Sequence, residues 1–282
     1  MAQNGFSYRS GENGVVYSVC DAFSEAGGCA HCFSTRVGGV SSGCLSSLNL
    51  GLERGDSAEN LQENYKRLAS AAGISSDGFC FTRQVHGDCV RGVAESDKKP
   101  VENGRDVPEC DGLLTGCENT PLVCVSADCV PVLLYAQSKQ DKTRRVCGAV
   151  HAGWRGTALR IVKKAVAKME AEYGVSPEDI VAAIGPSISP CCFLTHEDVP
   201  AIMKESLGGL CLDFIRPAKD GRFAVDLKGI NAALLAAAGV KRVFVSPDCT
   251  CCLNELYFSH RRDGALRGSM AAMIMLNSGG IG

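Results

Sequence analysis

The stretch Leu-Val-Cys-Val-Ser-Ala-Asp-Cys at residues 122–129 and the stretch Val-Cys-Gly-Ala-Val-His at residues 146–151 decide the fold of this chain. Both are apolar runs bounded by Gly or Pro, a pattern that indicates strands buried on both faces of a sheet. Each run ends in a reactive side chain, Cys129 or His151. Rigid sheets position the loops at their strand ends, and these loops often carry ligand chemistry. The sequence therefore predicts a site where these two strands stop.

A third residue of the same kind is His86, in Thr-Arg-Gln-Val-His-Gly at residues 82–87. Two imidazoles and one thiolate could bind zinc or copper. The same residues could equally supply a cysteine nucleophile with a histidine base. The residue types alone leave both interpretations open.

Composition limits the classes of protein that this chain can belong to. It has 282 residues, of which 45% are hydrophobic, enough for one large domain or two small ones. The net charge of -2 gives no electrostatic footprint for nucleic acid or an anionic membrane. No apolar stretch reaches the roughly 18 residues that a membrane-spanning helix needs. We therefore expect small-molecule partners, with neither nucleic acid nor membrane.

The chain contains 17 cysteines, an odd number that argues against a complete disulfide framework. Its N-terminus, Met-Ala-Gln-Asn-Gly, lacks the charged and apolar regions of a signal peptide. We expect a cytoplasmic protein whose thiols are mostly reduced and behave as small buried hydrophobes.

Strands and helices alternate along the chain, which favours a mixed α/β fold. Asp56 is expected to cap a helix over 57–72 that ends at Gly73, and Thr157 to cap an amphipathic helix with Met169 on its buried face. A third helix is expected over 227–238. Strands are expected at 79–83, 181–184, 241–245 and 270–276, two short strands within 14–33, and loops at 33–42 and 95–110. No linker is evident, so the prediction is a single domain, 1–282, of layered mixed β-sheets flanked by helices.

Five short motifs occur in the order found in the YfiH-type laccase-domain family, and the chain is identified as resembling that family from about residue 15 to residue 274. The motifs are Gln-Val-His-Gly at 84–87, Ser-Ala-Asp-Cys at 126–129, His-Ala-Gly-Trp-Arg-Gly at 151–156, Ile-Gly-Pro-Ser-Ile at 184–188 and Phe-Ser-His-Arg-Arg-Asp at 258–263. The resemblance implies a layered mixed α/β fold. It also implies a purine nucleoside phosphorylase that acts on adenosine, inosine and methylthioadenosine and deaminates adenosine. An earlier interpretation of the family is copper-dependent polyphenol oxidation.

The resemblance also implies roles for individual residues. His86, Cys129 and His151 match the family's zinc ligands and catalytic centre, with copper a possible alternative metal. Arg36, in Ser-Thr-Arg-Val-Gly-Gly, and Asn49 match its substrate-side residues. From its own position in a Gly-flanked loop, Arg155 is a further candidate for contact with an anionic substrate.

Two stretches depart from the family pattern. Leu-Glu-Arg-Gly-Asp at 52–56 replaces a common His-Val-Gly-Asp, and Phe-Leu-Thr at 193–195 replaces an aromatic-Glu-Val after the pair Cys191-Cys192.

Several other polar residues have structural interpretations that compete with functional ones. Asp128 precedes Cys129 and either fixes the turn or orients a ligand. The charged stretch at 260–263 either forms a solvated turn or reaches the site. Cys191-Cys192 and the cysteines at 249–252 resemble a metal cluster but lack paired C-x-x-C motifs at zinc-ribbon spacing, so buried or unpaired thiols are favoured.

The leading functional hypothesis is a zinc-dependent purine nucleoside phosphorylase with adenosine deaminase activity, using nucleoside and phosphate as partners and acting as a monomer or homodimer. The main alternative is a metal-independent Cys129–His151 amide hydrolase, for example one that corrects peptidoglycan precursors. A copper-dependent polyphenol oxidase is a further alternative. A multicopper centre is disfavoured because the chain has 5 histidines in total. A third alternative is a non-enzymatic metal-binding protein. It predicts a metal whose coordination positions are all filled by protein donors, with no pocket beside it.

Overall fold

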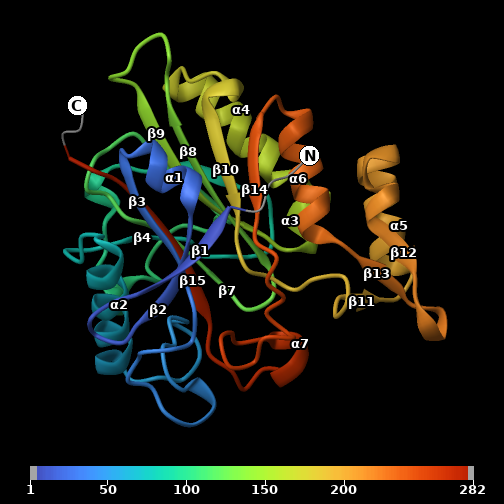
Figure 1. Ribbon diagram of the computed structural model, residues 1–282, viewed down its shortest axis with the longest axis horizontal. Coiled ribbons are helices and arrows are strands. Elements are labelled where there is room, and N and C mark those ends of the chain that lie inside the picture. Colours follow the sequence, from blue (N-terminus) through green and yellow to red (C-terminus); the bar gives the residue numbers. More distant parts are fainter. Residues whose placement is uncertain (1–4, 279–282) are drawn as a thin grey trace.

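The computed structural model describes residues 5–278, and its elements are arranged as two six-stranded sheets with helices on their outer faces (Figure 1). A small three-stranded sheet and one helix extend to the side. This layered mixed α/β architecture confirms the predicted fold class. Among residues 5–278, no helix combines the length and apolar character needed to cross a membrane.

The first sheet has the order β14-β10-β8-β9-β6-β5. Its strands are β5 (Val90–Gly92), β6 (Gly112–Thr115), β8 (Val130–Gln137), β9 (Arg145–Ala152), β10 (Ile180–Ile184) and β14 (Arg242–Val245). β8 and β9 form a long antiparallel pair in which Val130 lies opposite Ala152, and β10 pairs in parallel with β14. This pairing brings the start of β8 beside the end of β9, which places Cys129 near His151.

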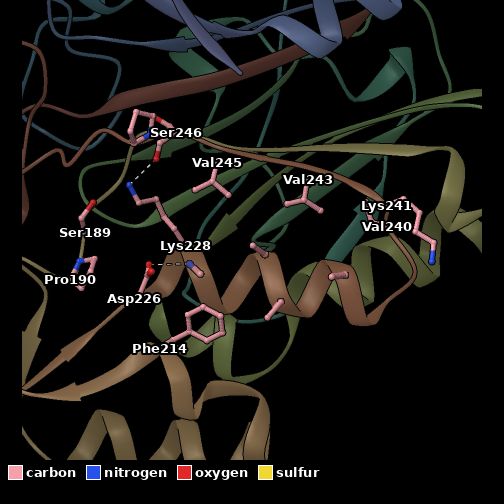
Figure 2. A pocket seen from close by; sticks show the side chains of 15 residues that line it. Ser189, Pro190, Phe214, Asp226, Lys228, Val240, Lys241, Val243, Val245 and Ser246 are labelled. Atoms are coloured by element: carbon pink, nitrogen blue, oxygen red, sulfur yellow. Dashed lines mark hydrogen bonds between the residues drawn. The ribbon is translucent and has the colours of Figure 1, made fainter. Parts of the chain in front are cut away.

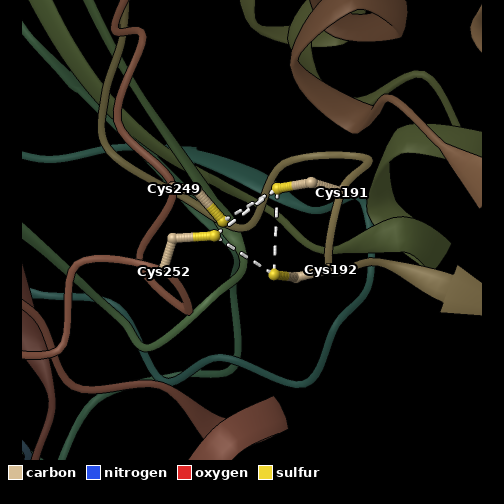
Figure 3. Close-up of side chains that lie close together, drawn as sticks. All are labelled: Cys191, Cys192, Cys249 and Cys252. Carbon is tan, nitrogen blue, oxygen red and sulfur yellow. Dashed lines mark hydrogen bonds between the residues drawn. The ribbon is translucent and has the colours of Figure 1, made fainter.

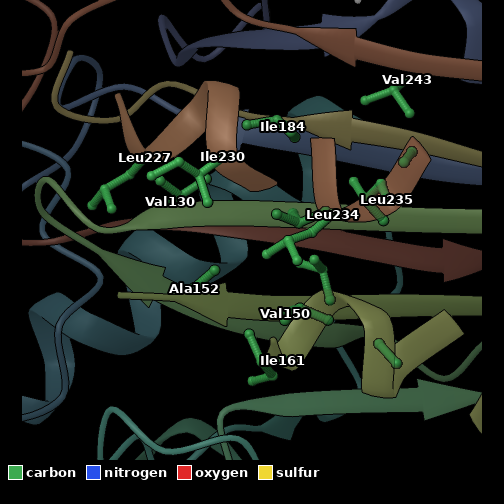
Figure 4. Packing of buried hydrophobic residues seen from close by; sticks show 14 of the residues in the cluster. Val130, Val150, Ala152, Ile161, Ile184, Leu227, Ile230, Leu234, Leu235 and Val243 are labelled. Carbon is green, nitrogen blue, oxygen red and sulfur yellow. The ribbon is translucent and has the colours of Figure 1, made fainter. Parts of the chain in front are cut away.

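Helices cover the outer face of the first sheet. They are α3 (Trp154–Ala158), α4 (Ile161–Tyr173) and α6 (Leu227–Ala237). Figure 4 shows Leu234 and Leu235 of α6 packing over the sheet near Ile184 and Val150. This close-packed apolar layer supports the central β8–β9 pair on the side that faces the helices.

The second sheet has the order β1-β2-β3-β15-β7-β4. Its strands are β1 (Phe6–Ser10), β2 (Val16–Cys20), β3 (Cys29–Ser34), β4 (Cys80–Phe81), β7 (Leu122–Ser126) and β15 (Met270–Leu276). Helix α2 (Ala58–Ala72) packs on its outer face through Leu61, Tyr65 and Leu68, and α1 (Asp21–Ala26) joins β2 to β3. Side chains from both sheets, including Cys124, Leu133 and Ile274, fill the layer between them.

The remaining elements lie outside the two large sheets. Strands β11 (Leu194–Thr195), β12 (Ile215–Pro217) and β13 (Phe223–Val225) form the small sheet, accompanied by α5 (Asp198–Leu207), and the short helix α7 (His260–Asp263) precedes β15. Short 3₁₀ turns occupy Gly43–Leu45, Glu95–Asp97, Val101–Asn103, Pro177–Asp179, Gly208–Phe214 and Lys219–Gly221.

Several predicted boundaries differ from the structure. Helix α2 is capped by Ser57, whose hydroxyl accepts the Asn60 N–H, and not by Asp56. The expected helix at Thr157 begins earlier, at Trp154, and is divided into α3 and α4 because Arg160 adopts a left-handed φ of 62°. Thr157 does not cap it: its buried hydroxyl accepts a hydrogen bond from Asn231.

Two further stretches differ in part from the prediction. The strand expected over 122–129 ends at Ser126, since Asp128, with a φ of 92°, turns the chain into β8. The region 14–33 contains a helix, α1, between its two strands. The predicted extent of the domain, 1–282, stays a prediction.

Candidate metal and nucleoside site

His86, Cys129 and His151, here called the triad, meet at one end of the paired sheets. His86 lies in the turn after β4, Cys129 in the β7–β8 turn and His151 near the end of β9. Their ligand atoms all lie within 4.8 Å of one another. The two imidazole rings are nearly perpendicular, with centroids 5.0 Å apart. The structure therefore brings together the three residues that the sequence predicted as metal ligands.

A buried carboxylate, Asp111, fixes two members of the triad. Its Oδ1 lies 2.9 Å from His151 Nδ1 and also accepts the backbone N–H of His86. Its Oδ2 accepts the N–H groups of Val85 and Gly87. A carboxylate accepts and cannot donate, so His151 Nδ1 carries a proton and Nε2 is the nitrogen that would bind a metal after it loses its own proton. Asp111 lies in none of the motifs, although a lone aspartate at the start of the apolar stretch 111–115 is a usable signal.

Charges in this cluster favour the deprotonated sulfur. Burial by itself raises the pKa of Cys129, but the imidazolium of His151 and hydrogen bonds from both histidines lower it to about 6. For His151, burial lowers the pKa, and the Cys129 thiolate and Asp111 more than offset this and raise it. The hydrogen bond and charge of His151, with the backbone N–H groups, hold the pKa of Asp111 below its usual value despite burial. A thiolate and an oriented imidazole are the forms that bind metals.

The donor set fits a metal ion with an open coordination position. Two nitrogens and one sulfur converge, and no fourth His, Cys, Asp or Glu ligand joins this group within residues 5–278. Gly153 lies directly against the set: a Cβ there would come within 3.0 Å of His86 Cδ2 and 3.4 Å of Cys129 Sγ. A side chain at this position would thus occupy space beside the ligands. Three protein ligands with one open position are typical of catalytic zinc.

A cavity of about 430 Å³ adjoins the triad through His86 and Cys129. Its apolar wall is formed by Ile188, Phe193 and Leu227. This volume lies within the range of sites that bind small molecules. A larger cavity of about 740 Å³ lies between β14 and α6, as Figure 2 shows, but it contains none of the triad. Of these two cavities, only the smaller one adjoins the triad.

The smaller cavity is also lined by cationic side chains: Arg54, Arg155, Arg261 and Arg267. Arg267 is only 8% exposed and donates from Nη1 to Gly268 O and Ser269 Oγ, yet its Nε has no hydrogen-bond partner among the described residues. Burial and the neighbouring charge of Arg54 lower the pKa of Arg267 to about 10, so it remains cationic near neutral pH. A buried cation with an unpartnered N–H indicates an anion-binding position.

The structure distributes the predicted substrate residues unevenly. Arg155 lines the cavity and stacks on Trp154, with its guanidinium carbon 4.2 Å from the ring centroid. Arg36 lies elsewhere, over Phe258, and donates from Nε and Nη2 to Ser46 O. Asn49 is fully buried, donates to Asp56 and accepts from the N–H groups of Gly51 and Ser269. Neither Arg36 nor Asn49 lines this cavity, because their polar atoms bind protein groups outside it. Their contacts with substrate stay predictions.

The two motif interpretations that sequence left open are resolved separately. Asp128 accepts hydrogen bonds from Thr250, Ser259 and the Arg261 N–H, so it fixes the turn and joins it to α7. Within the charged stretch at 260–263, His260 and Arg261 line the cavity. Arg54, part of the departure at 52–56, and Arg267 were not identified as site residues, since neither lies in a recognisable motif.

Comparison with known proteins agrees with this geometry. The family model described as multi-copper polyphenol oxidoreductase laccase matches residues 30–277. "Purine nucleoside phosphorylase YlmD" of Geobacillus stearothermophilus is 37% identical over 248 residues, 86% of this chain and 88% of that protein. "Purine nucleoside phosphorylase YfiH" of Escherichia coli is 32% identical and covers 88% of this chain and 94% of its own length.

A solved structure extends the likeness to three dimensions. The crystal structure of YlmD from Geobacillus stearothermophilus has a TM-score of 0.86, is 33% identical, and covers 96% of this chain and 99% of its own. The matched segment includes the triad, Asp111 and the cavity arginines. The chain therefore belongs to the multi-copper polyphenol oxidoreductase laccase family, which includes the YfiH and YlmD proteins.

Proposed function

We propose that the protein is a zinc-dependent purine nucleoside phosphorylase that converts adenosine, inosine or methylthioadenosine, with phosphate, to the free base and the ribose 1-phosphate, and that also deaminates adenosine. Its named relatives are purine nucleoside phosphorylases. We place it in the cytoplasm, a compartment that keeps thiols reduced.

One observation carries the proposal: a single cavity is lined by His86 and Cys129 of the triad, by apolar walls, and by arginines that form no ion pair within residues 5–278. Phe193, Ile188 and Leu227 offer an apolar surface suited to the flat purine. Arg54 and Arg267 offer the fork-shaped donors that bind phosphate. A metal-binding protein without an enzymatic role would not need this cavity.

Each part of the phosphorolysis reaction can be assigned to residues of the cavity. In phosphorolysis the bond from C1′ to the purine nitrogen breaks, a phosphate oxygen bonds to C1′, and the base leaves with the electron pair and gains a proton. Arg54 and Arg267 would hold the phosphate beside C1′ and balance its charge as the bonds change. A zinc ion on the triad would act as a Lewis acid and lower the pKa of a bound water to about 7. Asp111 would keep His151 in the tautomer that the site requires.

Product analysis tests the proposal. Adenosine is incubated with and without phosphate, and the products are separated by chromatography. We expect adenine and ribose 1-phosphate only when phosphate is present, and inosine and ammonia from the deaminase reaction. Purine release that is equal without phosphate would contradict phosphorolysis.

A second candidate is favoured by the order Cys129–His151–Asp111, which has the form of a nucleophile, a base and an orienting carboxylate. This arrangement would suit a metal-independent amide hydrolase. Removal of metal with a chelator separates the two: the phosphorylase loses activity and regains it with zinc, whereas the hydrolase remains active. Oxygen uptake with a phenol, in zinc- and copper-loaded protein, tests the polyphenol oxidase alternative.

A further inference from the structure

A second group of metal-binding side chains lies outside the triad. The sequence pattern favours buried or unpaired thiols for Cys191-Cys192 and the cysteines at 249–252. The structure brings four of these sulfurs together from two separate loops, as Figure 3 shows. We call Cys191, Cys192, Cys249 and Cys252 the four-cysteine cluster.

The spacing of the sulfurs matches a tetrahedral site. Cys191 Sγ lies 3.8 Å from Cys192 Sγ, 3.7 Å from Cys249 Sγ and 3.6 Å from Cys252 Sγ. Cys192 Sγ lies 3.4 Å from Cys252 Sγ, and all four sulfurs lie within 4.8 Å of one another. A regular tetrahedron with Zn–S bonds of about 2.3 Å has edges of about 3.8 Å. The sulfurs thus already stand near the corners that one ion would require.

Other arrangements of four cysteines fit less well. Disulfide bonding requires S–S distances of about 2.0 Å, far shorter than any of these separations. In a four-iron cluster each thiolate binds a different iron, which holds the sulfurs farther apart than a single ion does. A tetrahedral set of four sulfurs is diagnostic of zinc or iron, and four protein ligands are typical of a structural site.

The local backbone also supports a ligated sulfur. The Ser189 N–H points at Cys249 Sγ, 3.3 Å away, as an N–H donor that would stabilise a thiolate. The Cys252 N–H donates to Cys249 O and forms the tight turn of the C-x-x-C sequence. Ser187 and Cys249 form an isolated parallel bridge that sets the two loops side by side. Cys191 and Cys252 are exposed, which gives an ion a path of entry.

We propose that Cys191, Cys192, Cys249 and Cys252 bind one zinc ion as a closed structural site, separate from the triad. Its effect would be to cross-link two walls of the nucleoside cavity. The first loop carries Ile188 and Phe193, and the second leads into His260 and Arg261. Arg261 already ties the loops together by donating to Cys192 O and Leu194 O.

The test is a metal inventory of untagged protein, dialysed against a weak chelator and measured by mass spectrometry. We expect two zinc ions per chain in the wild type, one in Cys129→Ala and one in Cys252→Ser. The variant that combines Cys129→Ala with Cys252→Ser should contain none. Cys251→Ser is the matched control, because Cys251 lies in the same turn but outside the cluster, and it should keep both ions. The proposal is wrong if Cys252→Ser and the double Cys192→Ser, Cys252→Ser variant retain the wild-type zinc content.

Cobalt substitution gives an independent reading that needs no change in the cluster. In Cys129→Ala, the cobalt that remains should show the absorption bands of a tetrahedral tetrathiolate site. These are intense d–d bands in the visible range and sulfur-to-metal charge-transfer bands. Absence of these bands, or a mass two hydrogens lower for each disulfide formed among the four cysteines, would overturn the proposal. Neither measurement depends on nucleoside turnover, so the proposed enzymatic function can fail without affecting it.

Discussion

The triad and the four-cysteine cluster are both sets of metal-binding side chains from distant parts of the chain, but they differ in what surrounds them. The triad has three donors, a buried carboxylate that orients one of them, and a cavity beside it. The four-cysteine cluster has four like donors and two exposed members. An open set next to a cavity suits chemistry on a ligand, whereas a closed set suits the joining of loops.

The backbones of the two sets differ as well. His86 and Asp128 have positive φ values of 60° and 92°, conformations that non-glycine residues rarely adopt. Hydrogen bonds to Asp111 and from Thr250 and Ser259 hold these turns. Strained backbone conformations of this kind are concentrated at functional sites, where side chains must hold particular directions. None of the four cluster cysteines has a positive φ among the described residues. The local backbone conformation thus sets the directions of the triad side chains, whereas the four-cysteine cluster forms because two loops lie side by side.

The largest effect is expected from Cys129→Ala. This change removes the one sulfur donor of the triad, so the metal at that site should be lost and turnover should fall to background. Metal content and phosphate-dependent adenine release measure the two consequences. Full occupancy of the triad in this variant would show that the three residues do not form the metal site, and Cys44→Ala, at an exposed thiol elsewhere, serves as the control.

Asp111→Asn should have the next largest effect. The amide keeps the size of the carboxylate but loses its charge and cannot accept from three N–H groups and His151 as well. Loss of such a supporting group lowers metal affinity or activity by about 10–100-fold. Competition with a chromophoric chelator measures the affinity. Unchanged affinity and activity would mean that Asp111 serves the fold alone.

Arg54→Ala should weaken the use of phosphate while leaving the metal in place. A lost charge-assisted hydrogen bond costs about 1.5 kcal/mol, roughly a tenfold rise in the KM for phosphate. Arg36→Ala is the matched control and should leave this KM unchanged, because Arg36 binds Ser46 O away from the cavity. If the KM for phosphate rose only in Arg36→Ala, the phosphate would bind at the loop 33–42 and not at Arg54.

The smallest effect concerns the reactivity of Cys129 in metal-free protein. Its lowered pKa of about 6 means that the thiolate predominates above that pH, whereas an ordinary thiol ionises near pH 8.5. At pH 7 the gain in thiolate is nearly offset by weaker nucleophilicity, so alkylation should be only about twofold faster than for an ordinary thiol.

The diagnostic is the midpoint of the alkylation rate against pH, read peptide by peptide by mass spectrometry. It should lie near pH 6 for Cys129 and well above it for the exposed Cys44. Added zinc should protect Cys129. A midpoint near pH 8.5 for Cys129 would show that the histidines do not stabilise its thiolate.

Local sequence determined much of this protein. Apolar runs bounded by Gly and Pro located β7, β9, β10 and β15, and periodicity with a C-terminal glycine located α2, whereas β8 was not predicted. Ordered motifs identified the family and brought out His86, Cys129 and His151. These features depend on burial and on backbone conformations that neighbouring residues specify.

The tertiary structure alone decided which polar groups meet. Asp111, Arg54 and Arg267 lie outside the motifs. The pairing of β6 with β9 brings Asp111 to His151, and the folded chain brings Arg54 and Arg267 to the cavity beside the triad. Arg36 and Asn49 sit in motifs, yet packing gives their polar atoms protein partners elsewhere. Cys191 and Cys252 are adjacent only because β10 and β14 run in parallel and their following loops leave the sheet together. Hydrogen bonds and metal coordination require atoms within a few ångströms, and for residues far apart in the chain only the completed packing of the sheets sets those distances.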